Sequence, residues 1–548
     1  MRFPNISKNH AFTAAPVRSP ASAATRDAFN GNLLLIWVAA LTVIGFFIAN
    51  ATASPTDLTA RFTVDDSFYY FETAWRTKQN GFVTFDSINS ANGVHFLWFM
   101  IVLAAAFLAP GKIALLYIIY GLSLLLVVGV YAAIWRVGTL MDDRRRFLTL
   151  LMTLVWSVIL IDRRHLLLVG MESTVHMAVL WGSLIAGLTT LKKDADKSGS
   201  SGNWYLLFTA ATVLVTWARL DAALFSFALY AFITYNIVKN GNIGRVITTR
   251  YIAYSLAIAI TGAVLQIGFF YSAGGTVIPI SALVKQTGIG PEIAVGAWGR
   301  LMSVIFPFST FVDENSPWFW LVEAVFFAAL LFYVVMRACR SEPPIGYLHG
   351  VAASLGATII VYAGIVGGGH DPFWRWYLAP VFLFYMLGIA CAFHEAFGRL
   401  NGRLLGSKSA AGIACAIAVP LFLVIMAATH RPIPLYLTRA QVGLFLKDTA
   451  GKGDVFASFN SGQVGFLSEH PMINLDGLVN SRDYLNNVFN KPDRIIAYLN
   501  KYNVRYIIDY NFYWASEEIL KNTTLKYTFE IPGDYKQRSL YVREMNAR

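Results

Sequence analysis

The sequence predicts a mainly α-helical protein that crosses a membrane many times and carries a small α/β domain at its C-terminal end. Three observations lead to this fold class. Of the 548 residues, 56% are hydrophobic and only 14% are charged. The apolar residues come in repeated blocks of about twenty, the length that a helix needs to cross about 30 Å of hydrocarbon. Past Thr429 the composition changes, and Gly, Asn, Asp and Lys return.

Eleven apolar blocks are candidates for membrane-spanning helices. They lie near residues 32 to 50, 113 to 135, 147 to 162, 173 to 191, 204 to 218, 222 to 238, 251 to 271, 317 to 336, 347 to 366, 376 to 396 and 411 to 429. The first block is longer than a signal-peptide core and no obvious Ala-x-Ala site follows it, so we expect a retained helix. The sequence thus predicts about eleven transmembrane helices within residues 32–429, after a disordered cytoplasmic tail at residues 1–31.

One further apolar stretch, Val94 to Ala109, is ambiguous because at about sixteen residues it is short for a crossing. Counting it as a span would place every later loop on the opposite side of the membrane. If it does not cross, the most basic loops all fall on the side of the N-terminal tail, which the positive-inside rule makes the cytoplasm. These loops carry Arg136 with Arg144 to Arg146, Lys192 with Lys193, Lys239 with Arg245 and Arg250, Arg337 with Arg340, and Arg399 with Arg403. We therefore expect a half-buried juxtamembrane helix here, within a first external loop at residues 51–112.

The net charge of +12 has the same explanation. In a soluble protein such a charge favours a nucleic-acid partner, but here Lys and Arg sit mainly in short loops between apolar blocks, where they act as topology signals. The expected partner is therefore the lipid bilayer and not a nucleic acid. The three cysteines, Cys339, Cys391 and Cys415, indicate neither a disulfide framework nor a Cys-based metal site.

The region after the last apolar block, residues 430–548, is long enough for a small domain with its own core. Asp454 to Ser458 and Val504 to Asp509 have the composition of short strands, and Arg494 to Asn500 that of a helix between them. We expect a compact α/β domain. An odd number of spans places it in the periplasm.

The acidic pair Asp65-Asp66 is the strongest pointer to chemistry. It lies about fifteen residues past the first predicted span, at the head of a run whose aromatic residues Phe68, Phe71 and Trp75 recur at helical spacing. One interpretation is that the carboxylates cap an interfacial helix. The other is that one carboxylate is a general base for an acceptor hydroxyl, its pKa adjusted by its partner and by the apolar surroundings. We favour the second interpretation, with Asp65 as the base.

Other charged groups stand at the external ends of predicted spans. Glu172 opens the helix that begins near residue 173, where it either caps the helix or takes part in a site. Arg219 and Asp221 interrupt an otherwise continuous apolar stretch, and a charge in mid-bilayer costs about 2.5 to 3.5 kcal/mol, so such residues are normally paired or functional. A contact between Arg219 and Asp221 within a tight external turn is the structural alternative.

Two external loops bring basic residues to the same face. Lys285 ends the mostly apolar segment Pro279 to Lys285, where it either offers a point charge to a phosphate at the lipid boundary or reaches for water. The loop Gly367 to Pro372 holds His370 and leads to Arg375, a combination suited to sugar hydroxyls or phosphate. The alternative is that its glycines only form a turn. No His-Glu-x-x-His spacing occurs, so a catalytic zinc is unsupported.

In chain order, the motifs are Asp65-Asp66 in the first external loop, Asn92 to Trp98 on a second juxtamembrane helix, Gly170-Met171-Glu172, Arg219-Leu220-Asp221, Pro279-Ile280-Ser281 with Lys285, and a soluble C-terminal domain. This order resembles the GT-C superfamily of integral-membrane glycosyltransferases, in particular the bacterial arabinofuranosyltransferase-like envelope enzymes. The resemblance spans essentially the whole chain, through motifs that are each short. One departure is Leu220, where similar proteins often have Pro.

The resemblance implies a donor sugar linked to a polyprenyl phosphate and an acidic residue of the first external loop as base. On matching positions it makes Asp65 and Asp66 the catalytic pair. It makes Lys285 and Arg375 the cations for the lipid phosphate. It places around the sugar Glu172, Arg219, Asp221, His95 and His370. Some GT-C members need a divalent cation, for which the candidate ligands are Asp65, Asp66 and Glu172, although nothing in the sequence itself requires a cofactor.

Together these features predict an inverting glycosyltransferase of the bacterial cytoplasmic (inner) membrane. It would move a sugar from a polyprenyl-phosphate donor to a glycan, lipid or protein acceptor of the cell envelope, at the outer face. The alternative is a multi-span transporter or flippase of lipid-linked glycans, although the polar residues gather on one face and no internal repeat is evident. A third reading is an envelope-assembly protein whose C-terminal domain binds a partner.

Overall fold

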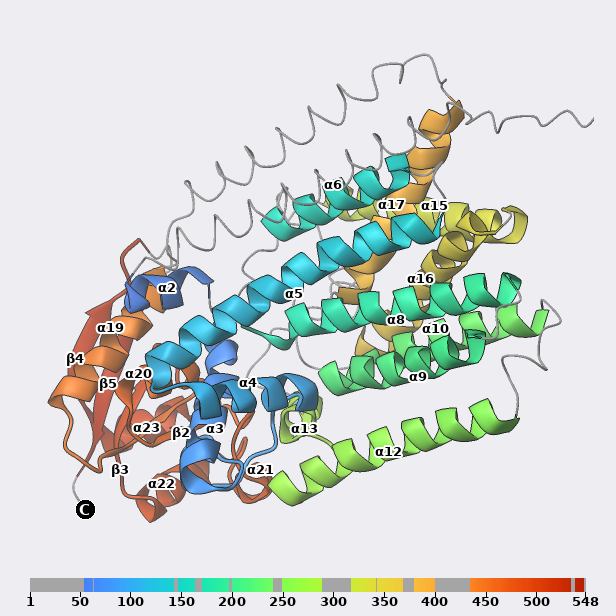
Figure 1. Cartoon of the computed structure of the whole chain (residues 1–548). Helices are drawn as coiled ribbons and strands as arrows, with labels where there is room; N and C mark the ends of the chain where they lie inside the picture. The colour runs from blue at the N-terminus through green and yellow to red at the C-terminus, as the bar shows by residue number, and fades with distance from the viewer. Residues whose placement is uncertain are drawn as a thin grey trace, which may run out of the picture.

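The computed structural model describes residues 54–62, 64–141, 146–162, 170–196, 200–239, 249–287, 317–341, 343–367, 379–399, 434–533 and 538–546. Most of this part of the chain is helical, with a small sheet near the C-terminal end (Figure 1). The described helices before residue 400 are α2 (Pro55–Phe62), α3 (Asp65–Asn80), α4 (Phe96–Leu108), α5 (Lys112–Leu140), α6 (Arg146–Asp162), α8 (Glu172–Ala195), α9 (Ser201–Ala218), the 3-10 helix η2 (Leu220–Ala222), α10 (Ala223–Lys239), α12 (Thr249–Gly274), α13 (Ile280–Thr287), α15 (Pro317–Arg340), α16 (Ile345–Gly367) and α17 (Ala379–Arg399).

The membrane part is multi-pass. Of the eleven blocks predicted to span, those near 32 to 50 and 411 to 429 lie outside the described residues, and each of the others coincides with a helix. Six helical segments of the described chain are long and apolar enough to cross a membrane: Lys112–Leu140, Glu172–Ala195, Leu220–Lys239, Arg250–Gly274, Ile345–Ala363 and Ala379–Ala396. The total of about eleven crossings is not confirmed and stays a prediction.

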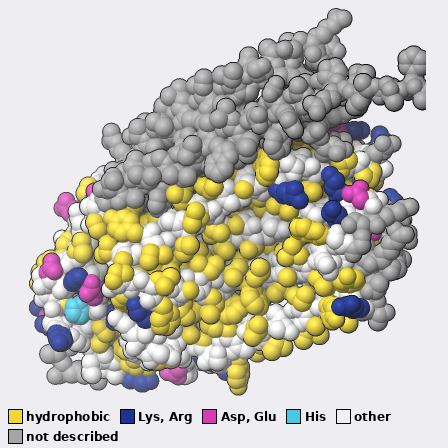
Figure 2. Space-filling model, viewed as in Figure 1, with side chains coloured by type: hydrophobic (Ala, Val, Ile, Leu, Met, Phe, Trp, Pro, Cys, Tyr) yellow, Lys and Arg dark blue, Asp and Glu magenta, His cyan; other side chains and the backbone are white. Residues whose placement is uncertain are grey.

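The long helices run side by side, and the C-terminal domain lies at one end of them, close to α2, α3, α4 and α13 (Figure 1). On the face seen in Figure 2, apolar side chains cover the flank of the helical part and charged side chains gather toward its two ends. On α12, Ile260, Val264 and Tyr271 are 60%, 62% and 64% exposed. Large apolar side chains are stable in such positions when lipid tails, and not water, surround them.

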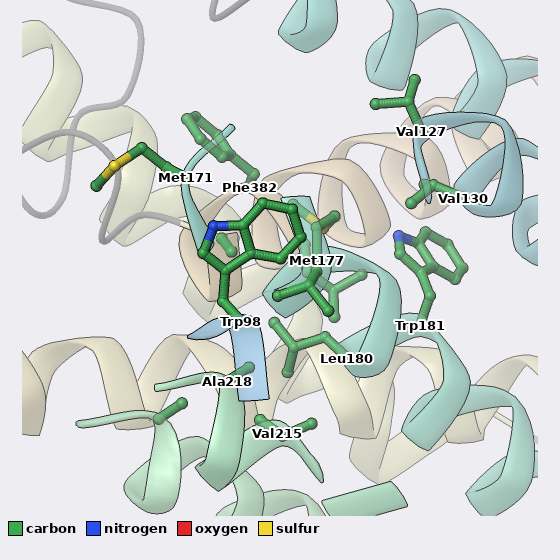
Figure 3. Close-up of a cluster of buried hydrophobic side chains, with 14 of the residues drawn as sticks. Trp98, Val127, Val130, Met171, Met177, Leu180, Trp181, Val215, Ala218 and Phe382 are labelled. Carbon is green, nitrogen blue, oxygen red and sulfur yellow. The ribbon is translucent and has the colours of Figure 1, made fainter. Parts of the chain in front are cut away.

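The apolar helix α4 is too short to cross the membrane. Its 13 residues extend over about 20 Å, less than the ~30 Å of a hydrocarbon core. It packs against the membrane helices, and its Trp98 is fully buried among side chains that include Met177 and Leu180 of α8 and Val215 of α9 (Figure 3). The indole Nε1 of Trp98 donates a 2.8 Å hydrogen bond to the carbonyl oxygen of Gly170. The half-buried helix expected from the sequence is therefore present.

The C-terminal domain begins with α19 (Pro434–Thr449) and contains a five-stranded sheet. Its strands are β1 (Val455–Ser458), β2 (Met472–Asn474), β3 (Val504–Asp509), β4 (Thr523–Glu530) and β5 (Ser539–Met545), in the order β2-β1-β3-β5-β4. β1 is parallel to β2 and β3, whereas β5 is antiparallel to β3 and β4. The connecting helices are α20 (Gly462–Ser468), α21 (Arg482–Asn487), α22 (Pro492–Lys501), the 3-10 helix η6 (Tyr513–Ala515) and α23 (Ser516–Asn522).

The expected α/β character of this domain is confirmed, because β1, β3 and α22 lie where two strands and a helix were predicted. Neighbouring strand residues point to opposite faces of a sheet, so Ile507 and Ile508 of β3 are buried on different sides. Ile507 belongs to a core that also includes Ile280 and Val284 of α13, whereas Ile508 belongs to the large core that includes Phe68 of α3. The domain is thus packed onto α3 and α13 together.

Candidate active site

Helix α3 lies between the C-terminal domain and the membrane helices, and it carries the acidic pair. Helix residues three or four apart share a face. The face that meets the C-terminal domain, here named the domain face, holds Asp65, Tyr69 and Arg76, which bind that domain directly. It also holds Glu72, whose partners Arg76 and Lys112 both bind the domain. The adjoining face holds Asp66 and Tyr70 and is named the membrane face. The two neighbouring aspartates therefore have different surroundings.

Asp65 binds the C-terminal domain. Its Oδ1 accepts a 2.9 Å hydrogen bond from the backbone N–H of Gln463, and its Oδ2 accepts one of 3.2 Å from Gly462, at the start of α20. A guanidinium nitrogen of Arg439 lies 3.6 Å from Oδ1. The N-cap of α3 is Val64, with no side-chain cap. The alternative that the pair caps its own helix is therefore wrong for Asp65, whose carboxylate instead accepts hydrogen bonds from the first backbone N–H groups of α20.

Glu72 and Lys112 form a buried ion pair beside this contact. Lys112 Nζ lies 2.5 Å from Glu72 Oε2 and donates at 2.9 Å to the backbone oxygen of Phe466 in α20. Arg76 binds Glu72 Oε1 at 2.6 Å and donates to two backbone oxygens of the C-terminal domain at 3.0 Å. Lys112 is buried, so without Glu72 it would be a destabilising unpaired charge.

Two glycines permit close backbone contact at this junction. A Cβ atom on Gly462 would lie 2.2 Å from the backbone oxygen of Asp65. A Cβ atom on Gly93 would lie 1.6 Å from the backbone oxygen of Leu478 in the C-terminal domain. Any larger residue would push the domain away from α3 or from the segment before α4. The sequence therefore fixes the separation of the two parts.

Asp66 lies in a different environment. Its side chain is partly exposed and forms no hydrogen bond or ion pair with any residue in the described part of the chain. Removal from bulk water raises the pKa of Asp66 to about 7, against the opposing charges of Lys285 and Arg439. The negative charges of Asp65 and Glu172 add to the rise. An accessible carboxyl group with a pKa near neutrality is suited to proton transfer.

Glu172, at the start of α8, is the centre of a polar network. Its Oε2 accepts a 2.9 Å hydrogen bond from the Tyr70 hydroxyl, and its Oε1 accepts one of 2.6 Å from Arg219. His95 Nε2 lies 3.5 Å from the same Oε1. Burial lowers the pKa of His95 to about 4, so its ring is neutral at pH 7. The N-cap of α8 is Met171, which leaves Glu172 to bind these side chains.

Arg219 extends the network to Asp221. Its Nε and Nη2 bind the two carboxylate oxygens of Asp221 at 3.0 and 2.9 Å, a bidentate pair. The Tyr362 hydroxyl of α16 donates to Asp221 Oδ2. The contact that formed the structural alternative is therefore present, and Arg219 carries it on to Glu172. The structure thus brings together four of the residues assigned to the sugar: Glu172, Arg219, Asp221 and His95.

Lys285 lies in α13, and Asn92 holds the start of this helix. The buried amide of Asn92 donates to two oxygens near the end of α12, at 2.7 and 2.8 Å, and accepts a 2.8 Å bond from the N–H of Ile280. The segment that carries His95 thus also positions α13. Lys285 is partly buried, and its positive charge acts on both Asp66 and His95. A cation therefore lies near Asp66 and near the Glu172 network.

Two of the predicted residues, His370 and Arg375, lie outside the described residues. The divalent-cation site left open by the sequence has no geometric support. Among the residues that the structure describes, no group of three or more His, Cys, Asp and Glu side chains is placed to hold a metal ion. Asp65, Asp66 and Glu172 do not form such a group, because the two aspartates belong to different faces of α3.

One carboxyl group at this junction was missed by the sequence analysis. Asp476 follows β2 in the C-terminal domain, and its Oδ2 accepts a 2.6 Å hydrogen bond from the Tyr69 hydroxyl. The negative charge of Asp66 acts on it. The polar residues of the domain face recur at helical spacing, which was a usable signal that α3 meets another part of the protein. Its partner lies 407 residues away, too far for any local pattern to indicate.

Comparison with solved structures shows which known folds the protein resembles. The chain is similar to the archaeal oligosaccharyltransferase AglB from Archaeoglobus fulgidus in complex with an inhibitory peptide and a dolichol-phosphate, at 11% identity and a TM-score of 0.50, over 93% of this chain and 74% of that one. It is also similar to ArnT from Cupriavidus metallidurans bound to undecaprenyl phosphate, at 12% identity and a TM-score of 0.45, over 93% and 97%.

The family model that matches the sequence covers a smaller part of the chain. The family described as a domain of unknown function (DUF8728) matches residues 430–545, which is the C-terminal domain. No curated protein sequence matches. The likeness to AglB, at this low identity, concerns the fold alone, and the protein thus shares the overall fold of an oligosaccharyltransferase.

Proposed function

We propose that the protein is an inverting glycosyltransferase of the bacterial inner membrane. It transfers a sugar from a polyprenyl-phosphate donor to an acceptor of the cell envelope. The observation that carries this proposal is Asp66, an accessible carboxyl group with a pKa near 7 beside the charge of Lys285 and the Glu172 network. The fold supports it, since AglB is an oligosaccharyltransferase in complex with a dolichol-phosphate and a peptide.

The geometry favours Asp66 over Asp65 as the base, which revises the expectation from sequence. Both oxygens of Asp65 already accept backbone hydrogen bonds from α20, and Arg439 lies near it. A base must be able to reach the proton that it abstracts. Of the two aspartates, Asp66 is the one whose side chain is partly exposed and not bound by another described residue.

The proposed reaction is a single displacement. Ionised Asp66 takes the proton of an acceptor hydroxyl while the hydroxyl oxygen forms a bond to the anomeric carbon. The bond from that carbon to the phosphate oxygen breaks, and polyprenyl phosphate leaves as a stable anion that needs no proton. Attack opposite the leaving group inverts the anomeric carbon. We assign Lys285 to the phosphate, with Arg375 as the second cation predicted from sequence.

The Glu172 network is assigned to the donor sugar. Glu172, Arg219 and Asp221 are held by bonds to one another and to Tyr70 and Tyr362, so their polar atoms have fixed directions. Fixed donors and acceptors can bind sugar hydroxyls without a large loss of side-chain entropy. The neutral ring of His95 and the predicted His370 complete this set.

The orientation in the membrane is proposed from charge. Basic residues stand in the last turns of helices, at the ends far from Glu172 and Asp221: Lys192 and Lys193 of α8, Lys239 of α10, and Arg337 and Arg340 of α15. The positive-inside rule makes that side the cytoplasm. The tail at residues 1–31 is then cytoplasmic, about eleven spans make up residues 32–429, and the domain at 430–548 is periplasmic.

The proposal is tested with purified protein in liposomes. The donors are labelled pentoses and hexoses on undecaprenyl phosphate, and the acceptors are the glycan and glycolipid fractions of the cell envelope. We expect Asp66→Asn to lower the transfer rate about 10³-fold, within the range of a lost general base. Asp483→Asn, which changes an exposed aspartate of the C-terminal domain, should keep the wild-type rate.

Three other results would each contradict part of the proposal. Full transfer by Asp66→Asn together with loss in Asp65→Asn would restore Asp65 as the base. Consumption of no donor of the panel by the wild-type protein would contradict the glycosyltransferase. Movement of labelled lipid across the bilayer without its consumption would favour the transporter or flippase.

A further inference from the structure

The C-terminal domain contributes a carboxyl group to the junction, that of Asp476. Its Oδ2 accepts the 2.6 Å hydrogen bond from Tyr69, and its Oδ1 accepts one of 2.8 Å from the backbone N–H of Leu478. Tyr69 follows Asp66 by three residues on α3, so the two side chains project from adjacent parts of the helix. Asp476 is therefore presented to the same region as the proposed base, by a different part of the chain.

The loop that carries Asp476 is firmly held. The side-chain amide of Asn480 donates to the backbone oxygen of Asn474 at 2.6 Å, and the Tyr484 hydroxyl donates to that of Leu475 at 2.6 Å. On its other side, the loop touches Gly93, two residues before His95. This loop thus lies between α3 and the segment that reaches the Glu172 network. Its position is fixed before any substrate binds.

The charges around the two carboxyl groups differ. Asp66 has the positive charges of Lys285 and Arg439 near it. Asp476 forms no ion pair with a lysine or arginine of the described chain. The titratable groups that act on it or feel its charge are Tyr69 and Asp66 of α3 and Tyr484 of α21. At neutral pH the pair is therefore expected to consist of one ionised and one protonated carboxyl group.

We propose that Asp476 is an acceptor-binding residue and that it selects a carbohydrate acceptor, by binding a second hydroxyl group beside the one that Asp66 deprotonates. This inference rests on the proposed function and deepens it. Burial raises the pKa of Asp476 to about 8, so at pH 7 its carboxyl group can both donate and accept a hydrogen bond. A sugar hydroxyl group both donates and accepts hydrogen bonds, so a group with the same two capacities suits it. The C-terminal domain then determines which acceptor is used, while the membrane part binds the donor.

The experiment compares two fates of the same donor. Without an acceptor, water takes the place of the acceptor hydroxyl, and the labelled undecaprenyl-phosphate sugars are hydrolysed. With the envelope glycans present, the sugar is transferred. We expect Asp476→Ala to lower the ratio of transfer to hydrolysis at least tenfold. Asp476→Asn, whose amide both donates and accepts, should keep this ratio within threefold of the wild-type value. Asp493→Ala, at an exposed position of the same domain, serves as the control.

The pH dependence supplies a readout that a merely structural role would not change. In the wild-type protein the ratio should fall above pH 8, because ionised Asp476 no longer donates and adds a second negative charge. In Asp476→Asn the ratio should stay level from pH 7 to 9. Tyr69→Phe, which removes the hydroxyl that binds Asp476 but keeps the ring, should give an intermediate ratio. This variant guards against an Asp476→Ala protein that fails to fold.

The results that overturn the inference are distinct from those that overturn the proposed function. If Asp476→Ala and Tyr69→Phe lower transfer and hydrolysis by the same factor, or change neither, Asp476 does not bind the acceptor. If a peptide fraction of the envelope accepts the sugar and the glycan fraction does not, the carbohydrate assignment is wrong. If the wild-type protein neither hydrolyses nor transfers any sugar of the panel, the glycosyltransferase itself is wrong.

Discussion

The two faces of α3 use the same residue types for different purposes. On the domain face, each carboxylate is paired: Asp65 with two backbone N–H groups of α20, and Glu72 with Lys112 and Arg76. On the membrane face, Asp66 is not paired in this way with any side chain that the structure describes, and its pKa is near 7. A paired carboxylate holds the domain in place, whereas an unpaired one is available for proton transfer.

The largest effect is expected from Glu72→Gln, which removes the buried negative charge of the domain face. The substitution leaves Lys112 and Arg76 without their counter-charge, and removing one partner of a buried pair costs about 3 to 5 kcal/mol. We expect a lower melting temperature and faster proteolysis of the C-terminal domain. Glu517→Gln, which removes an exposed charge, is the control. A Glu72→Gln protein as stable as this control would show that the pair does not hold the domain.

Arg219→Lys tests the Glu172 network, which Tyr70 of the membrane face joins. Lysine keeps the charge but cannot bind Asp221 bidentately and Glu172 at the same time. We expect the transfer rate to fall about 10- to 100-fold, equivalent to about 1.4 to 2.7 kcal/mol in the activation free energy. Arg250→Lys, at the exposed start of α12, is the matched substitution. An unchanged rate in Arg219→Lys would make the network purely structural.

The pH dependence sharpens the comparison. Because ionised Asp66 is the base, transfer should rise between pH 6 and 8 with a midpoint near pH 7. Its pKa in the folded state is raised above the ordinary value of 3.8. The stability that protonated Asp66 contributes is therefore fully present below pH 3.8 and is lost as the pH rises through 7. Asp66→Asn should melt at a higher temperature than wild type at pH 8, and at nearly the same temperature at pH 3.5.

The smallest effect is expected from Glu469→Gln, at the rim of the same junction. Glu469 pairs with Lys447 at 2.6 Å, but both side chains are about half exposed, and such surface pairs contribute roughly 0 to 1 kcal/mol. The melting temperature and the proteolysis rate should match the wild type. A loss as large as that of Glu72→Gln would mean that burial does not distinguish the two glutamates.

Much of the fold was predictable because its signals are local. Apolar blocks of about twenty residues predict helices from their length alone, and the described α-helices from α5 to α17, apart from the short α13, lie where those blocks were found. β1 and β3 were recognisable from short runs such as Val504 to Asp509, with turn residues on either side. Arg219 and Asp221 of the Glu172 network were also recognisable, because charges inside apolar sequence are expensive unless they are paired.

The division of roles between Asp65 and Asp66 was not predictable. The helical period shows that neighbouring residues point about 100° apart, but not what each of them faces. The partners of Asp65 are Gly462 and Gln463, and the partner of Tyr69 is Asp476. These contacts join parts of the chain that are about 400 residues apart, and only the tertiary structure brings them together. Lys112 was likewise hidden, at the boundary of an apolar block.

The most direct measurement places Asp65→Asn and Asp66→Asn side by side in two assays, the rate of sugar transfer and the hydrogen exchange of α20. We predict that Asp66→Asn lowers the rate about 10³-fold and leaves the exchange unchanged. We predict that Asp65→Asn speeds the exchange of α20 and lowers the rate less than tenfold, because it weakens two backbone hydrogen bonds. Loss of transfer in Asp65→Asn with α20 still protected would contradict this division of roles.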